Sequence, residues 1–214
     1  MRENPFGRLS KLSEDAREKL SAYGALLREI NGRVNLLSRK DTDDLEYRHI
    51  ALCAAISEIF EPRDGASIAD VGTGGGLPGV VLSILYPRAK VSMFDGVGKK
   101  VCAINEMVDA LGLTNARAYH ERIEEHKGRF DYATGRAVCA LPQFFRFLKG
   151  KLRPGKNGNL PNGVLYFKGG CLEDELIQKR ILPDAELDLQ NFFGDALFEG
   201  KKICHFAFGD VARI

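Results

Sequence analysis

Apolar residues near the start of the chain recur every three or four positions, whereas later ones gather in short runs. The first stripe predicts an amphipathic helix that begins after Ser13 and ends near Gly32. Its apolar positions are Ala16, Leu20, Tyr23, Leu27, Ile30 and Val34. A second stripe predicts another helix from Thr42 to about Pro62. We expect residues 1–64 to form a helical extension that packs on the rest of the chain.

After residue 64, short apolar runs alternate with helical patterns, and this alternation predicts a parallel sheet with helices on both faces. The predicted strands are 67–71, 90–94, 116–119, 130–134 and 163–168, followed by two near 185–192 and 202–208. The predicted helices are 77–86, 98–111, 121–126, 141–152 and 172–180. We therefore expect one α/β domain over residues 65–214, with ligands beyond the carboxyl ends of its strands.

A glycine-dense turn follows the first predicted strand. Asp70 is succeeded by Gly72, Gly74 and Gly76, and glycine lets a backbone take positive φ and approach a ligand closely. The next strand ends on Asp95, whose carboxylate is placed to accept hydrogen bonds from a ribose diol. These two strand ends are typical of one half of an adenosine-cofactor site.

The spacing of the glycines separates the candidate cofactors. A dinucleotide motif needs a third glycine at position 77, which is Leu77, and a P-loop needs Lys-Ser or Lys-Thr after its glycines. The Asp-x-Gly-x-Gly-x-Gly pattern instead resembles the first motif of the S-adenosylmethionine (SAM)-dependent methyltransferases. That resemblance implies a Rossmann-like, seven-stranded, mostly parallel sheet and SAM as the cofactor. Another nucleotide cofactor, or a turn without any ligand, is the alternative.

The composition is ordinary for a globular chain, and 214 residues suffice for one α/β domain. The five cysteines include no C-x-x-C pair, so neither a disulfide framework nor a metal site is predicted. The first residues lead into no apolar signal segment, and no apolar run is long enough to span a membrane. We expect a soluble, cytoplasmic monomer.

The net charge of +2 conceals an uneven distribution. Between Asp131 and Glu173 there is no acidic residue but there are seven cations, namely Arg136, Arg146, Lys149, Lys151, Arg153, Lys156 and Lys168. Such a cluster is typical either of a solvated helix end or of a surface that faces phosphates. Lys99 and Lys100 begin a predicted helix, where cations oppose the dipole, and this weakly favours an external anionic partner.

Six segments, taken in order, resemble one family over nearly the whole chain. They are Val34–Ser38, Tyr47–His49, Asp70–Gly79, Asp95 with Gly98–Lys100, Gly135–Ala137 and Phe167–Gly169. The family is the ribosomal RNA small subunit methyltransferase G family, also called glucose-inhibited division protein B. The resemblance implies SAM-dependent methylation of a guanine N7 in the 530-loop region of 16S ribosomal RNA, with the free RNA or the 30S subunit as the partner.

The resemblance also implies roles for individual residues. It predicts a cofactor pocket made by Gly72, Leu77, Ile123, Glu124 and Arg136, with Asp95 at the ribose. The residues predicted to bind RNA, from charge or from the resemblance, are Asn35, Arg48, Lys99, Lys100, Arg146, Lys149, Lys151 and Arg153. The chain departs from the family in Asp95-Gly96 for Asp-Ser, in Gly135-Arg136 for Ser-Arg, and in a turn lengthened by residues 157–162.

Guanine N7 carries an in-plane lone pair, so its attack on a methyl group needs good geometry and no general base. The chain lacks the Asn/Asp-Pro-Pro-aromatic motif of exocyclic amine methylation and the Pro-Cys pair of cytosine-C5 chemistry. We predict that Arg136 holds the methionine carboxylate or an RNA phosphate, and that Lys168 holds a phosphate or the base edge. A surface ion pair and a solvated lysine are the plainer alternatives.

The sequence is also compatible with three other functions. One is a SAM methyltransferase for a small molecule or a protein, which would transfer methyl groups without ribosomal RNA. Another is a NAD-binding oxidoreductase, which Leu77 disfavours. The third is a non-catalytic RNA-binding module on the same fold, which would bind RNA without turnover.

Overall fold

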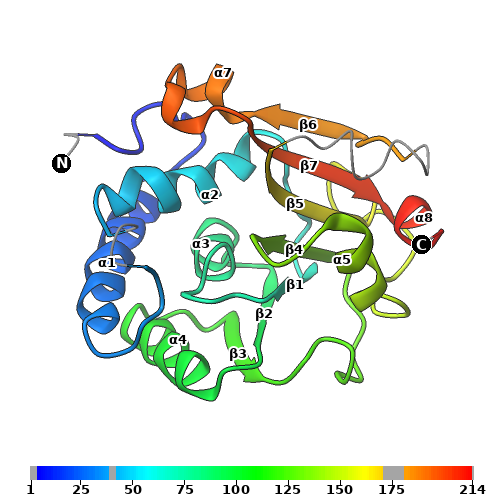
Figure 1. Cartoon of the computed structure of the whole chain (residues 1–214), viewed down its shortest axis with the longest axis horizontal. Coiled ribbons are helices and arrows are strands. Elements are labelled where there is room, and N and C mark those ends of the chain that lie inside the picture. Colours follow the sequence, from blue (N-terminus) through cyan, green and yellow to red (C-terminus); the bar gives the residue numbers. More distant parts are fainter. Residues whose placement is uncertain (1–3, 39–41, 171–180, 214) are drawn as a thin grey trace.

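A seven-stranded sheet runs through the centre of the molecule (Figure 1). The computed structural model describes residues 4–38, 42–170 and 181–213. The strands are β1 (Ser67–Val71), β2 (Lys90–Asp95), β3 (Ala116–His120), β4 (Tyr132–Arg136), β5 (Gly163–Gly169), β6 (Ala185–Asp188) and β7 (Lys201–Ala207), in the order β3-β2-β1-β4-β5-β7-β6. The strands β1 to β5 pair in parallel, whereas β7 is antiparallel to its neighbours β5 and β6. The predicted mostly parallel sheet of seven strands is confirmed.

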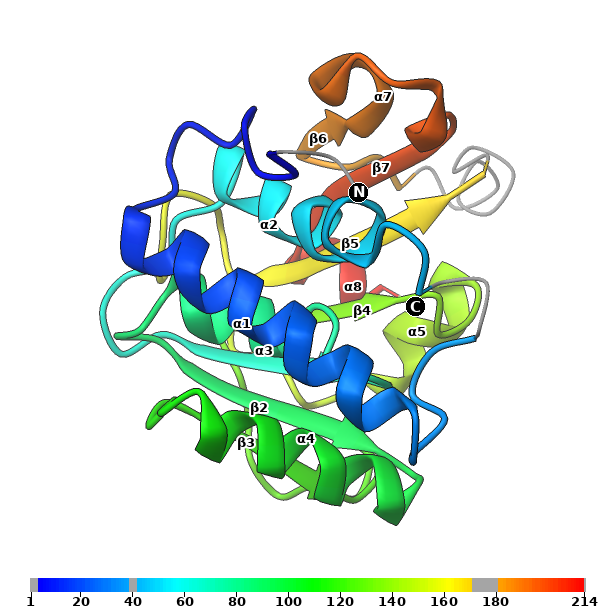
Figure 2. The ribbon, with the colours of Figure 1, turned by 90° about the vertical axis from the view of Figure 1, so that its left-hand side faces the viewer.

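Helices cover both faces of this sheet. The helical segments are α1 (Glu14–Asn31), η2 (Glu46–Ala51), α2 (Leu52–Ala54), η3 (Ala55–Glu58), α3 (Gly79–Leu85), α4 (Gly98–Ala110), α5 (Leu141–Phe147), α7 (Leu189–Phe193), η5 (Ala196–Phe198) and α8 (Phe208–Val211). Helix α1 crosses the same side of the sheet as α3 and α4 (Figure 2). The residues of α5 and α8 belong to the buried cluster on the opposite side.

Strand β1 shows why the central strands read as unbroken apolar runs. Ile68 belongs to the buried cluster on the α1 side, whereas Ala69 and Val71 belong to the cluster on the α5 side. A strand that is covered on both faces gains from an apolar residue at every position, so strict alternation disappears. The charged exception, Asp70, is wholly buried and lies near the carboxyl end of β1.

The helical extension packs into the same core as the sheet. Ser13 caps α1 as predicted, because its side chain accepts a hydrogen bond from the amide of Ala16 at 3.2 Å. The second predicted helix is helical from Glu46 to Glu58, but it passes from a π-helix through a short α-helix to a 3₁₀-helix. The apolar face of α1 joins the cluster that contains α3 and α4. The boundary between residues 1–64 and 65–214 stays a prediction.

Two predicted helices differ from the structure. Residues 121–126 form a turn and not a helix. The amides of Glu125 and His126 donate to carbonyls three residues earlier. The helix predicted over 141–152 ends at Phe147, because the chain turns through Gly150 at φ +72° and Leu152 then forms an isolated bridge with Phe130, just before β4. The helix predicted over 172–180 lies outside the described residues.

The strand predicted near 185–192 is also shorter in the structure. Strand β6 ends at Asp188, whose side chain accepts a hydrogen bond from the amide of Asn191 at 2.8 Å. Asp188 is therefore the N-cap of α7, which takes the residues that the apolar pattern had assigned to the strand.

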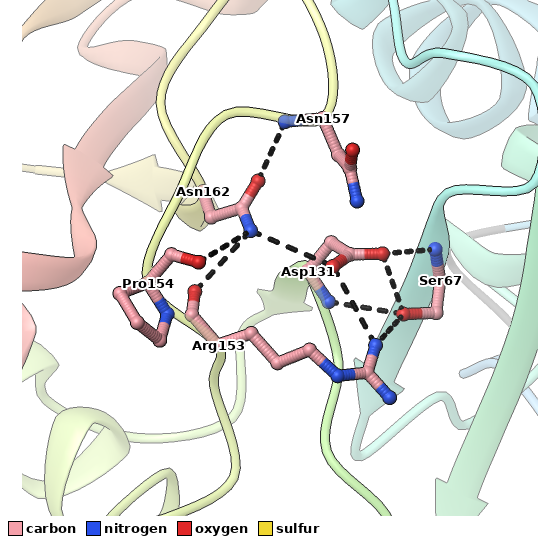
Figure 3. A network of polar contacts seen from close by, with 6 residues as sticks. All are labelled: Ser67, Asp131, Arg153, Pro154, Asn157 and Asn162. Atoms are coloured by element: carbon pink, nitrogen blue, oxygen red, sulfur yellow. Dashed lines mark hydrogen bonds and ion pairs between the residues drawn. The ribbon is translucent and has the colours of Figure 1, made fainter.

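A polar network links the amino ends of β1 and β4, which we call the amino edge of the sheet (Figure 3). Asp131 Oδ2 accepts hydrogen bonds from the amide and the hydroxyl of Ser67, both at 2.8 Å. Asp131 Oδ1 lies 3.5 Å from both Arg153 Nη1 and Asn162 Nδ2. Asn162 Oδ1 in turn accepts from the amide of Asn157 at 2.8 Å. The 157–162 turn is therefore fastened to β1 and β4, at the edge opposite the glycine turn.

The stability of this network depends on pH. Burial opposes the ionisation of Asp131, but the hydrogen bonds from Ser67 and the charge of Arg153 outweigh it and hold the pKa of Asp131 below its ordinary value. Because the pKa of Asp131 is lowered in the folded state, its ionisation stabilises the protein at pH values above the ordinary Asp pKa of about 3.9. This stabilisation is lost as the pH falls through the lowered pKa.

We expect Asp131→Asn, which removes the charge and keeps the shape, to lower the free energy of unfolding at pH 7 by about 1–3 kcal/mol. Urea denaturation should show the variant and the wild type converging as the pH falls through the lowered pKa of Asp131. Asp109→Asn, at an exposed position, is the control and should change little at either pH. A deficit of the same size at pH 7 and at low pH would contradict the assigned role of the charge.

Candidate active site

The glycine turn lies between the carboxyl end of β1 and the start of α3. Its backbone takes positive φ at Gly72 (+69°), Gly74 (+59°) and Gly76 (+92°). At Gly76 a Cβ would lie 2.6 Å from Val80 Cγ2, so a larger residue does not fit there. At the exposed Gly72 a Cβ would lie 3.0 Å from a methyl group of Val138 and would narrow the space between β1 and β4. The turn thus keeps a bare backbone at the sheet edge.

Asp70 lies beneath the turn. Its side chain is wholly buried, and Oδ2 accepts a hydrogen bond from the amide of Gly79 at 2.8 Å, which fixes the start of α3. Burial raises the pKa of Asp70 to about 6, although the Gly79 amide and the charge of Arg136 oppose this shift. The structure thus gives Asp70 a supporting position beneath the loop and no exposed surface for direct contact with a cofactor.

Asp95 ends β2 beside the same turn. Its Oδ2 accepts a hydrogen bond from the amide of Gly74 at 3.0 Å, and its Oδ1 accepts from the amide of Val97 at 2.9 Å. Each carboxylate oxygen has two lone pairs, so both can also accept from a ribose hydroxyl. The half-exposed side chain and the bare backbone at Gly72 fit the ribose side of SAM.

Tyr23 reaches the turn from the helical extension. Its hydroxyl donates to the carbonyl of Gly75 at 2.8 Å, and the side chain is wholly buried. Burial raises the pKa of Tyr23 well above its ordinary value, so the hydroxyl stays protonated and donates. In the sequence Tyr23 is one position of an apolar stripe, and nothing in that stripe indicated contact with the functional loop.

The other predicted cofactor residues occupy different kinds of position. Ile123 is buried in the cluster that includes Val71 and Phe94, and it lies in the turn that follows β3, while Glu124 is exposed beside it. The side chain of Leu77 is buried in the core on the α1 side, so only its backbone is placed to contact a ligand.

Arg136 ends β4 and meets a residue of the helical extension. Its Nη1 lies 3.0 Å from Nδ1 of His49. A guanidinium only donates hydrogen bonds, so this ring nitrogen of His49 accepts and carries no proton. The helical extension therefore orients the arginine that was predicted to act at the reaction centre.

A cavity of about 450 Å³ opens beside this pair. Arg48, Arg136 and Lys168 line it, together with Tyr166 and the backbone at Ala137, which has φ +55°. Its position at the carboxyl ends of β4 and β5 is the place where open parallel sheets bind their ligands. The cavity and the glycine turn therefore share one sheet edge.

Three of the residues predicted to bind RNA, Lys99, Lys100 and Asn35, lie near the glycine turn. Lys99 and Lys100 begin α4, just after Asp95, and the exposed Asn35 precedes Leu36, which lies beside Gly75.

The four predicted RNA-binding residues of the basic cluster, Arg146, Lys149, Lys151 and Arg153, do not line the cavity. Arg146 is exposed in the last turn of α5, and Lys149 is exposed beyond it. Lys151 donates to the carbonyl of His126, and Arg153 donates to Ser67 at the amino edge. The backbones of Lys151 and Arg153 bond to Phe130 just before β4, so this part of the cluster lies away from the glycine turn.

Two general features bear on the class of protein. Among the described residues, no three His, Cys, Asp or Glu side chains are grouped so that they could hold a metal ion. In the same part of the chain, no helix combines the length and the apolar character needed to cross a membrane.

The sheet order, the antiparallel β7, the glycine turn after β1 and the acid after β2 define a class I SAM-dependent methyltransferase. The solved structure of geranyl diphosphate C-methyltransferase from Streptomyces coelicolor A3(2) shares the fold, with a TM-score of 0.52 and 10% identity over 71% of this chain and 76% of that one. The predicted fold class and enzyme class are confirmed.

The chain belongs to the rRNA small subunit methyltransferase G family, whose profile matches residues 16–192. It is 37% identical over 194 residues to "Ribosomal RNA small subunit methyltransferase G" of Christiangramia forsetii, which covers 91% of each chain. It is 39% identical over 189 residues to the protein of the same name from Flavobacterium johnsoniae, covering 88% of this chain and 89% of that one. The family predicted from the sequence is confirmed, whereas the roles of single residues stay predictions.

We expect Tyr23→Phe to weaken SAM binding about three- to tenfold, because the Gly75 carbonyl loses its partner while the ring still packs. Isothermal calorimetry measures the change. Tyr86→Phe is the matched control, because the Tyr86 hydroxyl also donates to a carbonyl, that of Phe60 at 2.7 Å, away from the glycine turn. Equal SAM affinities for the two variants would show that Tyr23 has no part in shaping the site.

We expect Asp95→Ala to weaken SAM binding at least tenfold, because both the acceptor for the ribose and the tie to the Gly74 amide are lost. Asp188→Ala is the control, since it removes a carboxylate that likewise accepts from a backbone amide. Calorimetric titration of SAM should separate the two variants, and an unchanged affinity for Asp95→Ala would remove its ribose role.

Proposed function

We propose that this protein transfers the methyl group of SAM to N7 of a guanine in the 530-loop region of 16S ribosomal RNA. The observation that carries the proposal is membership in the rRNA small subunit methyltransferase G family over residues 16–192. The relatives named above carry "Ribosomal RNA small subunit methyltransferase G" as their name. The shared sheet edge of the glycine turn and the cationic cavity supports it physically.

Residues at the carboxyl ends of β1 and β2 would hold the cofactor. Asp95 would accept hydrogen bonds from the ribose, the backbone of Gly72 would face the cofactor, and Ile123 and Glu124 would border the base. Arg136 holds the methionine carboxylate, since a guanidinium matches a carboxylate in a bidentate fashion. When bound, SAM supplies an electrophilic methyl group.

The acceptor guanine enters the cavity between β4 and β5. Its N7 has a lone pair in the plane of the ring, so no proton leaves before the attack and the chain needs no general base. Among the described residues that line the cavity there is no carboxylate. Arg136 and Lys168 therefore act by holding charge and orientation, and correct positioning alone contributes about 7–11 kcal/mol in well-oriented reactions.

We further propose that the protein acts as a monomer in the cytoplasm, on the 16S RNA or on the 30S subunit. Every residue assigned to the cofactor side and to the acceptor side belongs to one chain. Its acceptor is ribosomal, and this places the reaction where small subunits are assembled.

The test is methyl transfer from radiolabelled SAM to unmodified 30S subunits, with protein-free 16S RNA alongside. Digestion and mass analysis locate the label. We expect 7-methylguanosine at one site in the 530-loop region. Label on no RNA, with SAM binding intact, would contradict the proposal and favour a small-molecule or protein acceptor.

We expect Lys168→Ala to lower kcat/KM for the RNA about ten- to a hundredfold, because a hydrogen bond to a charged group contributes about 1.5–3 kcal/mol. The affinity for SAM should stay unchanged, since the lysine lies at the end of β5, away from the glycine turn. Lys90→Ala, at the amino end of β2, is the control. Wild-type kinetics for Lys168→Ala would return this lysine to a merely solvated role.

A further inference from the structure

The cationic cavity extends beyond the residues assigned above, to strand β7. Because β7 is antiparallel to β5, its first residues lie at the edge where β5 ends. Lys202 is the cross-strand partner of Lys168, and Lys201 is the partner of Gly169. Both β7 lysines line the cavity. Neither was predicted from the sequence, where they lie more than thirty residues beyond Lys168.

The cavity lining is strongly unbalanced in charge. Its described residues include five Lys or Arg side chains and no Asp or Glu, namely Arg48, Arg136, Lys168, Lys201 and Lys202. Lys168 and Lys202 are directly opposite on neighbouring strands, an arrangement in which like charges repel. Glu186 already compensates Lys202 from the β6 side, and an anionic ligand in the cavity would add to this compensation.

The two β7 lysines are held in place by different contacts. Lys202 Nζ donates to Glu186 of β6 at 2.7 Å, and this hydrogen bond raises the pKa of Lys202, so the ammonium stays charged. Glu186 does not line the cavity. Lys201 Nζ donates to the carbonyl of Leu197 at 2.9 Å and lies 5.4 Å from the ring centre of Phe198. These two contacts help to position the Lys201 ammonium at the rim of the cavity.

We propose that Lys201 and Lys202, together with Lys168, bind a backbone phosphate of the RNA strand next to the acceptor guanine. The inference rests on the proposed function and deepens it. A strand that presents a guanine at the ends of β4 and β5 brings a phosphate with every nucleotide along the same edge. The row of cations from Arg48 to Lys202 comes from four separate segments of the chain, and such an extended row matches a continuous polyanion better than a single small anion.

The test compares the variant Lys201→Gln/Lys202→Gln with the wild type in binding protein-free 16S RNA over a series of KCl concentrations. We expect the Kd to rise about tenfold near 0.1 M salt and the salt slope to shrink by about one, since a single-stranded phosphate contact contributes about 0.7 to it. The affinity for SAM should not change. Lys90→Gln/Lys156→Gln removes the same charge at exposed positions of the amino edge and is the matched control.

A second variant tests the site in the opposite direction. Glu186→Gln removes the partner of Lys202 and leaves both lysines in place, so we expect tighter RNA binding, about two- to threefold, with a steeper salt slope. This variant keeps the proposal open to refutation if the double lysine variant does not fold. An unchanged or weaker affinity for Glu186→Gln would overturn it.

The remaining outcomes are also decisive. If Lys201→Gln/Lys202→Gln and the control double variant weaken binding equally, the effect is that of net charge and the phosphate site does not exist. If the wild type methylates 16S RNA while the β7 variant binds RNA normally, only the lysine site falls. If the wild type neither binds nor methylates the RNA, the proposed function falls as well.

Discussion

A backbone that must lie against a ligand cannot be anchored by side chains of its own, and this constraint governs the whole functional edge. The turn after β1 has glycine at positions 72, 74, 75 and 76, so neighbouring elements must fix its path. Tyr23 holds the Gly75 carbonyl from the helical extension, and Asp95 holds the Gly74 amide from β2. Asp70 holds the start of α3 from below. The extension therefore helps to fix the path of the glycine turn, which we propose binds the cofactor.

The same edge collects groups that are far apart in the sequence. Parallel strands end together, and so Asp95, Arg136 and Lys168 meet at one side of the sheet. The antiparallel β7 reverses this rule and contributes its first residues to that side. His49 adds a contact from the extension and orients Arg136. An edge rich in positive charge and without a carboxylate in the described cavity lining suits a reaction that requires positioning of a polyanion and no proton removal.

The sequence predicted the parts of this arrangement that depend on local chemistry. Glycine spacing, the acid after β2 and the strand ending in Arg136 follow directly from backbone and ligand requirements, and the structure places them at one edge. The contact of Tyr23 could not be predicted, because a stripe of apolar residues does not reveal which of them faces a loop. Lys201 and Lys202 escaped notice because their position depends on the direction of β7, which an apolar run does not specify.

The basic cluster was predicted to bind RNA from its charge, and that role stays a prediction. Arg146, Lys149, Lys151 and Arg153 are close in sequence, yet none of them lines the cavity. Arg153 joins Asp131 and Ser67 at the amino edge, where it helps to hold the lengthened 157–162 turn. Charge density along a chain therefore indicates a surface only when the strands and helices that carry it are placed.

The most direct test that the glycine turn and the cavity form one site is a crystal structure of the protein with S-adenosylhomocysteine. We expect both ribose hydroxyls within hydrogen-bonding distance of Asp95, the backbone of Gly72 against the ligand, and the sulfur atom facing the cavity lined by Arg136 and Lys168. A ligand whose ribose is turned away from Asp95, or whose sulfur is screened from that cavity, would contradict it.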